Sequence, residues 1–140
     1  MKTIYLGILF LLISYLPVCA NIQSDTTCYE NISCDDFNLL NETQDIFIID
    51  VRYFNDYKKE RIHNANSATD KDLVTLLLNG IKESESIYVY CYIGVKSKKI
   101  AKFICEELNY SNVYSLEGGI MQWKKKGYSV DKSPIVKNKN

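Results

Sequence analysis

The sequence has no excess of charge of either sign. Lysine plus arginine and aspartate plus glutamate number 17 each among the 140 residues, so the formal net charge at pH 7 is zero. This balance argues against a protein that binds nucleic acid or an anionic membrane surface through its overall charge. Any anion site in the chain must therefore be local.

Long hydrophobic runs are absent except at the N-terminus. There, Lys2 precedes an uncharged apolar stretch at residues 4–16, and Pro17 and the small residue Ala20 follow it. This layout is typical of a secretory signal peptide, which we assign to residues 1–20. The stretch is short for a membrane span, which needs about 20 apolar residues. We therefore expect an exported chain, periplasmic or secreted, with no stable membrane association after cleavage; the alternative is a membrane anchor formed by an uncleaved leader.

Metal ligands are scarce, because His63 is the only histidine. The cysteines beyond the leader are Cys28, Cys34, Cys91 and Cys105. Cys28 and Cys34 lie close together, but no second close pair completes a zinc set, so we expect no metal site. Thiols of exported chains tend to be oxidised, which leaves a Cys28–Cys34 disulfide and two free thiols as open interpretations. Cys105 falls on the apolar side of a predicted helix, which favours core packing.

The middle of the chain alternates between strand and helix patterns. Continuous apolar runs predict strands, and apolar residues at helical spacing predict helices. The expected strands are residues 45–51, 65–68, 86–92 and 112–116. The expected helices are residues 33–40 with a Ser33–Asp36 capping box, 54–59, 70–79 capped by Thr69, a segment that begins at Ser97, and a segment between Gly119 and Gly127. This alternation predicts an α/β fold, a mainly parallel central sheet with helices on both faces.

Cys91 stands where the expected strand at residues 86–92 ends, at the edge of a parallel sheet where ligands bind. Residues 91–96 must turn back before the helix begins near Ser97, and Gly94 permits the turn. Such a loop points backbone N–H groups inward and places a helix N-terminus beside the sulfur, and Lys96 adds a positive charge. These effects favour a thiolate nucleophile. From the loop alone, a small buried residue at a strand end is an equally good interpretation of Cys91.

Several separated motifs distinguish these two interpretations, because they share the order and spacing of one family. They are Asp50-Val51-Arg52, Asp56-Tyr57, Arg61-Ile62-His63-Asn64-Ala65, the loop Cys91-Tyr92-Ile93-Gly94-Val95-Lys96-Ser97, and Leu116-Glu117-Gly118-Gly119 through Trp123 to Gly127-Tyr128. Together they resemble the motifs of a rhodanese, specifically a small single-domain exported one. The resemblance covers residues 32–130, which leaves residues 21–31 as an N-terminal extension and residues 131–140 as a polar tail.

The resemblance implies a sulfurtransferase without a cofactor or metal. The Cys91 thiolate would take a sulfane sulfur from a small donor anion such as thiosulfate, and a thiol or cyanide would remove it from the resulting persulfide. Substrate would bind at the loop amides and at Arg52, and Asp50 and Ser97 would support the site. The residues that supply these loop amides are Tyr92, Ile93, Gly94, Val95 and Lys96. For Asp50 and Arg52, the alternative interpretation is a salt bridge that only stabilises the fold.

Some residues depart from the family pattern. Glu60, Arg61, His63 and Asn64 replace the Gly, His, Pro and Gly of the family, which predicts a different loop shape before the strand at residues 65–68. Tyr92 stands where many active members carry a basic residue, which predicts weaker thiosulfate binding. The alternative function is therefore a non-catalytic binding or thiol-redox module. A phosphatase is disfavoured, because Ser97 occupies the position where that chemistry needs an arginine.

Overall fold

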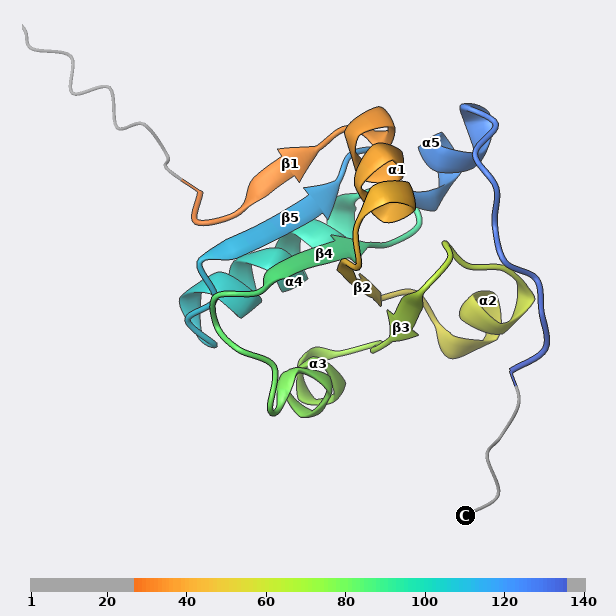
Figure 1. Cartoon of the computed structure of the whole chain (residues 1–140). Coiled ribbons are helices and arrows are strands. Elements are labelled where there is room, and N and C mark those ends of the chain that lie inside the picture. Colours follow the sequence, from red (N-terminus) through yellow and green to blue (C-terminus); the bar gives the residue numbers. More distant parts are fainter. Residues whose placement is uncertain (1–26, 136–140) are drawn as a thin grey trace, which may run out of the picture.

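The computed structural model describes residues 27–135 of the chain. Its strands are β1 (Glu30–Ile32), β2 (Phe47–Asp50), β3 (Ala65–Ser67), β4 (Ser86–Tyr90) and β5 (Asn112–Leu116). Its helices are α1 (Cys34–Thr43), α2 (Phe54–Lys59), α3 (Lys71–Leu78), α4 (Val95–Glu106) and α5 (Gly119–Lys125). The strands form one sheet in the order β1-β5-β4-β2-β3, and every neighbouring pair is parallel (Figure 1). The predicted parallel α/β fold is confirmed.

Helices cover both faces of this sheet, and β4 shows why. Side chains alternate between the two faces of a strand. Ile87 and Val89 belong to the core that α3 and α4 cover, whereas Tyr88 and Tyr90 belong to the core that α1 and α5 cover (Figure 1). Trp123 of α5 is almost fully buried in this second core. Because both faces are covered, β4 is apolar and buried from Ile87 to Tyr90.

The sheet and its packing reach beyond the domain limits that the sequence suggests. Glu30 and Asn31 of β1 pair with β5, although the sequence analysis places them in the N-terminal extension. At the other end, Asp131 bridges to Arg61 through both backbones and pairs with its guanidinium. Arg61 also donates to the Ser133 carbonyl at 3.2 Å. The first residues of the expected polar tail therefore pack against the domain.

Two helix starts differ from the prediction. Asp70, and not Thr69, caps α3, because its carboxylate accepts a hydrogen bond from the Leu73 amide at 3.0 Å. Aspartate and threonine are both good N-caps, so the sequence alone does not separate neighbours of this kind. α4 begins at Val95 and not at Ser97, with Gly94 as its N-cap in the left-handed conformation. The turn after Cys91 is therefore shorter than expected, and the helix N-terminus lies closer to the sulfur.

Neither of the two open interpretations of Cys28 and Cys34, a mutual disulfide or two free thiols, is right, because Cys28 is bonded to Cys105 of α4. Cys105 packs against the core that α4 covers, as expected, but it also carries this disulfide, which the sequence analysis did not foresee. β1 lies between Cys28 and Cys34, and an extended strand advances about 3.3 Å per residue. The Cα atoms of Cys28 and Cys34, on either side of this strand, are therefore further apart than the roughly 7 Å that a disulfide spans between Cα atoms. Cys34 is instead a free, buried thiol at the start of α1.

Within residues 27–135, none of the helices has the length and apolar character that crossing a membrane requires. The predicted signal peptide and most of the N-terminal extension lie outside the described residues.

Candidate active site

Cys91 directly follows β4, and its sulfur lies over the start of α4. The residue is 4% exposed. The Gly94 amide donates a hydrogen bond to its Sγ at 3.2 Å, and the Ser97 hydroxyl oxygen lies 3.7 Å away. Gly94 has a φ of 91°, a left-handed conformation that turns its N–H back toward the sulfur. Backbone amides and one hydroxyl therefore surround the thiol.

These neighbours decide the pKa of Cys91. Burial raises the pKa of this thiol, because the charged form loses water. Hydrogen bonds from the backbone and hydroxyl of Ser97 and from the amides of Gly94 and Ile93 lower it by more. The net pKa lies below that of an ordinary cysteine. Because the thiolate is the reactive form, Cys91 has the electrostatic setting of a nucleophile.

The side chain of Lys96, whose charge we expected to assist the sulfur, binds the segment before α3. Its ammonium donates to the Thr69 carbonyl at 2.6 Å and lies 5.6 Å from the centroid of the Tyr53 ring. The leading causes that lower the pKa of Cys91 are hydrogen bonds from Ser97, Gly94 and Ile93. Lys96 therefore ties the start of α4 to the segment between β3 and α3.

The N-terminus of α5 holds the other side of the loop. The amides of Ile120 and Met121 donate to the carbonyls of Cys91 and Tyr92 at 3.0 and 3.1 Å. In a trans peptide the N–H points opposite to the C=O, so the next amides point away from α5. Gly119 makes this approach possible, since a Cβ there would lie 2.4 Å from the Cys91 carbonyl oxygen. The closing Gly118-Gly119 motif thus sets the orientation of the loop amides.

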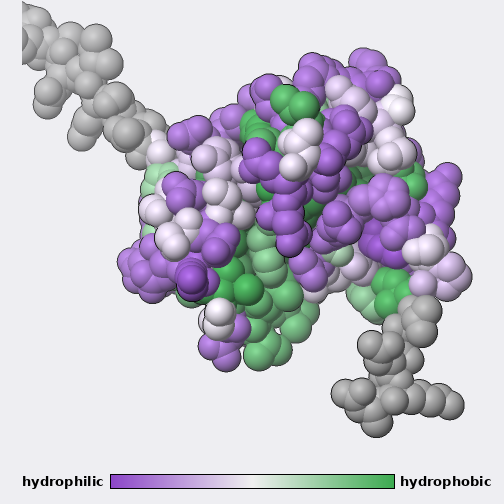
Figure 2. Space-filling model, viewed as in Figure 1, coloured by the Kyte–Doolittle hydropathy of each residue, from purple (hydrophilic) through white to green (hydrophobic). Residues whose placement is uncertain are grey.

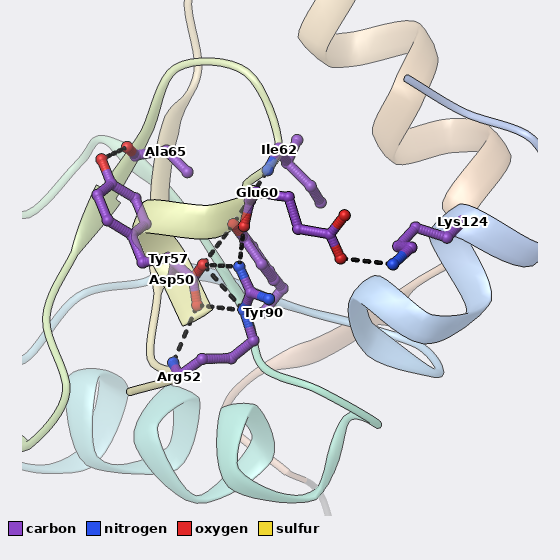
Figure 3. Close-up of polar contacts among 8 residues, drawn as sticks. All are labelled: Asp50, Arg52, Tyr57, Glu60, Ile62, Ala65, Tyr90 and Lys124. Carbon is purple, nitrogen blue, oxygen red and sulfur yellow. Dashed lines mark hydrogen bonds and ion pairs between the residues drawn. The ribbon is translucent and has the colours of Figure 1, made fainter. Parts of the chain in front are cut away.

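Beside the loop, Asp50 and Arg52 form a buried ion pair at the end of β2. Arg52 Nη2 donates to Asp50 Oδ2 and to the Glu60 carbonyl, both at 2.6 Å, and the Tyr90 hydroxyl donates to Asp50 Oδ2 at 2.6 Å. The Ile62 amide in turn donates to the Tyr90 hydroxyl at 3.1 Å (Figure 3). Burial, and then the Asp50 charge, raise the pKa of Tyr90 well above its usual value, so it stays a neutral donor. This network connects β2, β4 and the segment before β3, which agrees with the interpretation of the pair as a stabiliser of the fold.

Arg52 also contributes to a cavity over Cys91. The cavity measures about 680 Å³. Its lining residues are Val51, Arg52, Tyr53 and Asp56 after β2, Cys91, Tyr92 and Ile93 in the loop, and Val95, Lys96 and Lys99 in α4. Two further cavities, of about 560 and 480 Å³, are not lined by a cysteine among the described residues. The sulfur with the lowered pKa and an open volume therefore coincide at one place in the described part of the chain.

The family model for the rhodanese-like domain matches residues 33–126. This chain belongs to that family. A thiosulfate sulfurtransferase, GlpE, of Coxiella burnetii is 35% identical over 96 residues, which cover 69% of this chain and 88% of the relative. The crystal structure of a rhodanese-like domain protein from Staphylococcus aureus matches with a TM-score of 0.58 and 27% identity, over 67% of this chain and 90% of that one. A rhodanese-related protein from Thermoplasma volcanium shows the shared fold. It matches with a TM-score of 0.63 and 22% identity, over 75% of this chain and all of that one.

The site of this rhodanese-like domain includes residues that the sequence analysis missed. Ser115 of β5 donates from its hydroxyl to the Ser97 hydroxyl at 2.9 Å, and both residues are fully buried. When Cys91 is a thiol, the Ser97 hydroxyl donates to the Gly94 carbonyl at 3.1 Å, and its one proton can turn to the sulfur when Cys91 is a thiolate. A polar residue inside an otherwise buried strand is the signal that marks Ser115. Tyr90 carries a comparable signal, because it lies in register with Asp50 on the neighbouring strand.

No group of three or more histidine, cysteine, aspartate or glutamate side chains comes together as a metal site between residues 27 and 135.

Proposed function

We propose that this rhodanese-like domain is a sulfurtransferase that carries a sulfane sulfur as a persulfide on Cys91. The observation that supports this most is the amide-lined setting of the Cys91 sulfur, which lowers its pKa although the residue is buried. The printed names of curated relatives agree with it, since several are thiosulfate sulfurtransferases.

In the first half-reaction, the Cys91 thiolate attacks the outer sulfur of the donor. The S–S bond of the donor breaks, and its electron pair leaves on the rest of the donor, which is sulfite when the donor is thiosulfate. Negative charge then rests on the outer sulfur of the Cys91 persulfide and on the leaving group. The amides of Ile93 and Gly94 and the hydroxyl of Ser97 stabilise this charge, as donors in a water-poor site do.

In the second half-reaction, a thiolate or cyanide attacks the outer sulfur of the persulfide. The S–S bond between this sulfur and Cys91 Sγ breaks, and the electron pair returns to Cys91. A thiol with a lowered pKa is a good leaving group in such an exchange. The same hydrogen bonds therefore support both half-reactions.

Intact-protein mass spectrometry tests this function. Reduced wild-type protein incubated with thiosulfate or polysulfide should gain one sulfur, about 32 Da, and cyanide should remove it. Cys91→Ser should gain nothing. Cys34→Ser is the matched control, because Cys34 is the other free cysteine of the described residues, and it should behave as the wild type. A wild-type protein that gains no sulfur from either donor would leave the binding or thiol-redox module as the function.

We also propose that the chain is exported. The Cys28–Cys105 disulfide supports this, because disulfides persist mainly outside the reducing cytosol. Fractionation of the native host followed by mass spectrometry should find a chain that begins near Asn21 and carries this disulfide outside the cytoplasm. Full-length, reduced chain in the cytosol would contradict the proposal.

A further inference from the structure

The cavity over Cys91 is larger than a small inorganic donor needs. Its volume of about 680 Å³ falls within the range of roughly 300 to 1,000 Å³ that is typical of sites for organic molecules. Thiosulfate would occupy only a small part of it, next to the sulfur. The remaining volume therefore suits a donor with an organic group.

The walls of this cavity are largely apolar and free to make contacts. Tyr92, Ile93 and Val95 are each 57% exposed, and Tyr53 is 77% exposed. All of them line the cavity. Half-exposed tyrosine and aliphatic side chains around a cavity gain free energy when an apolar group covers them, and the two tyrosines can stack against an aromatic ring.

Two of the three positive side chains that line the cavity, Arg52 and Lys96, already have partners. Arg52 is bound to Asp50 and to the Glu60 carbonyl, and Lys96 is bound to the Thr69 carbonyl. Asp56 adds a negative charge to the lining, and Lys99 adds a positive one. Tyr92 supplies no charge where a basic residue would attract an anion. A second negative charge on the donor therefore gains little here, beyond what the loop amides provide.

From this lining we infer that the preferred donor is an organic monoanion whose sulfane sulfur is carried on an apolar, aromatic or branched group. This inference rests on the proposed sulfurtransferase function and specifies its substrate class. The organic group packs against Tyr92, Ile93 and Tyr53, and the sulfane sulfur faces Cys91. When Cys91 attacks, the S–S bond of the donor breaks and its electron pair leaves on an organic sulfinate or an organic thiolate.

A matched pair of donors tests this inference. Benzenethiosulfonate and methanethiosulfonate both transfer a sulfane sulfur and release a sulfinate, but only the first carries an aromatic ring. Each kcat/KM is divided by the rate of the same donor with a free low-mass thiol, which removes intrinsic reactivity. We expect the normalised phenyl-to-methyl ratio to be at least about tenfold, as one apolar group in a fitted pocket provides. Benzyl and methyl persulfides, measured in the same way, show whether donors with a thiolate leaving group give the same preference. A preference for the aromatic donor in either pair supports the inference.

Variants at Tyr92 connect this preference to the cavity. Tyr92→Ala should lower the phenyl-to-methyl ratio by at least about threefold, and Tyr92→Arg should raise kcat/KM for thiosulfate by a similar factor. Leu76→Ala is the matched control, because Leu76 is also an exposed apolar residue but does not line the cavity. It belongs to α3, over which a hydrophobic area is visible in Figure 2. The ratio of Leu76→Ala should equal that of the wild type.

The outcomes separate this inference from the proposed function. Protein that takes up sulfur from no donor contradicts the proposed function itself. Protein that takes up sulfur but shows a ratio near one for both pairs, with Tyr92→Ala unchanged, remains a sulfurtransferase and overturns the inference. In that case the apolar rim of the cavity serves another occupant, such as a partner protein.

Discussion

The two free cysteines of the described residues have similar surroundings at first sight and opposite pKa shifts. Cys34 and Cys91 are 2% and 4% exposed, and each lies at the N-terminus of a helix. Yet the pKa of Cys34 is raised and the pKa of Cys91 is lowered. Neither burial nor proximity to a helix N-terminus therefore makes a cysteine nucleophilic in this protein.

The difference lies in which backbone groups face the sulfur. Burial is the main cause that raises the pKa of Cys34, and the charges of Asp35 and Glu117 add to it against the opposing effect of Lys126. Its Sγ contacts the Glu117 carbonyl oxygen at 3.7 Å, which accepts from a thiol and repels a thiolate. Around Cys91 the groups are N–H donors, because α5 binds the carbonyls of the loop. The orientation of a few peptide groups therefore accounts for the opposite pKa shifts of the two thiols.

The substitution Gly119→Ala should remove this difference most completely. An added Cβ would collide with the Cys91 carbonyl, so the loop must move and its amides lose their orientation. We expect persulfide formation to fall by about 100-fold or more, and the free energy of unfolding in urea to fall by about 2 kcal/mol or more.

Gly127→Ala is the matched control for Gly119→Ala. Gly127 also has a positive φ, but an added Cβ there meets no atom within 4 Å. It should lose only about 1 to 2 kcal/mol of stability and keep its rate of persulfide formation. Equal effects of the two variants on that rate would show that the contact between α5 and the loop does not orient the amides.

Alkylation measures the difference between the two thiols directly. At neutral pH, iodoacetamide should modify Cys91 at least about tenfold faster than Cys34, because only Cys91 has a lowered pKa. Peptide mapping of wild type, Cys34→Ser and Cys91→Ser as a function of time gives both rates. Equal rates in the folded protein would contradict the assignment of Cys91 as the nucleophile.

Ser115→Ala should reduce the difference to a smaller extent. Without the Ser115 hydroxyl, Ser97 loses a donor that holds its hydroxyl beside the sulfur, so the pKa of Cys91 rises. The alkylation rate of Cys91 near neutral pH should fall by about twofold to tenfold, and its pH profile should move to higher pH. Ser86→Ala, in the same sheet but away from this chain of hydroxyls, should leave the profile unchanged. A lower stability with an unmoved profile would mean that Ser115 only packs.

The smallest expected effect is on the pH dependence of stability. The pKa of Cys91 is lowered on folding, so its contribution is fully present above the ordinary thiol pKa of about 8.5 and is lost as the pH falls through the folded value. The stability of wild type relative to Cys91→Ser should therefore rise with pH in this window, by on the order of 1 kcal/mol. For Cys34 the pKa is raised, so the corresponding contribution is present at low pH and is lost as the pH rises. Urea unfolding between about pH 6 and pH 9 measures both slopes, and two slopes of the same sign would contradict the assignment.

Local sequence was sufficient to predict much of the fold and the turn that follows Cys91. β4 is a continuous apolar run, and the glycine and helix start that follow Cys91 are neighbours in sequence, so their geometry depends on few residues. What the sequence could not give depends on register between distant segments. The hydroxyls of Ser115 in β5 and Ser97 in α4 meet only when these two elements pack together. Lys96 binds the Thr69 carbonyl only after β3 and α3 are in place. The disulfide partner of Cys28 lies 77 residues away. The closeness of Cys28 and Cys34 in the sequence was therefore misleading.

The Cys28–Cys105 disulfide makes a closed covalent ring of most of the domain. It contains β2, β3, β4 and the Cys91 loop, and it fastens the short edge strand β1 to α4. Closing a loop of this length lowers the chain entropy of the unfolded state, which stabilises the folded state by about 4.5 kcal/mol. A protease that cuts once between the two cysteines therefore leaves both pieces joined. In a protease-rich environment, a nicked molecule would keep its strands and Cys91 together in one covalently linked molecule.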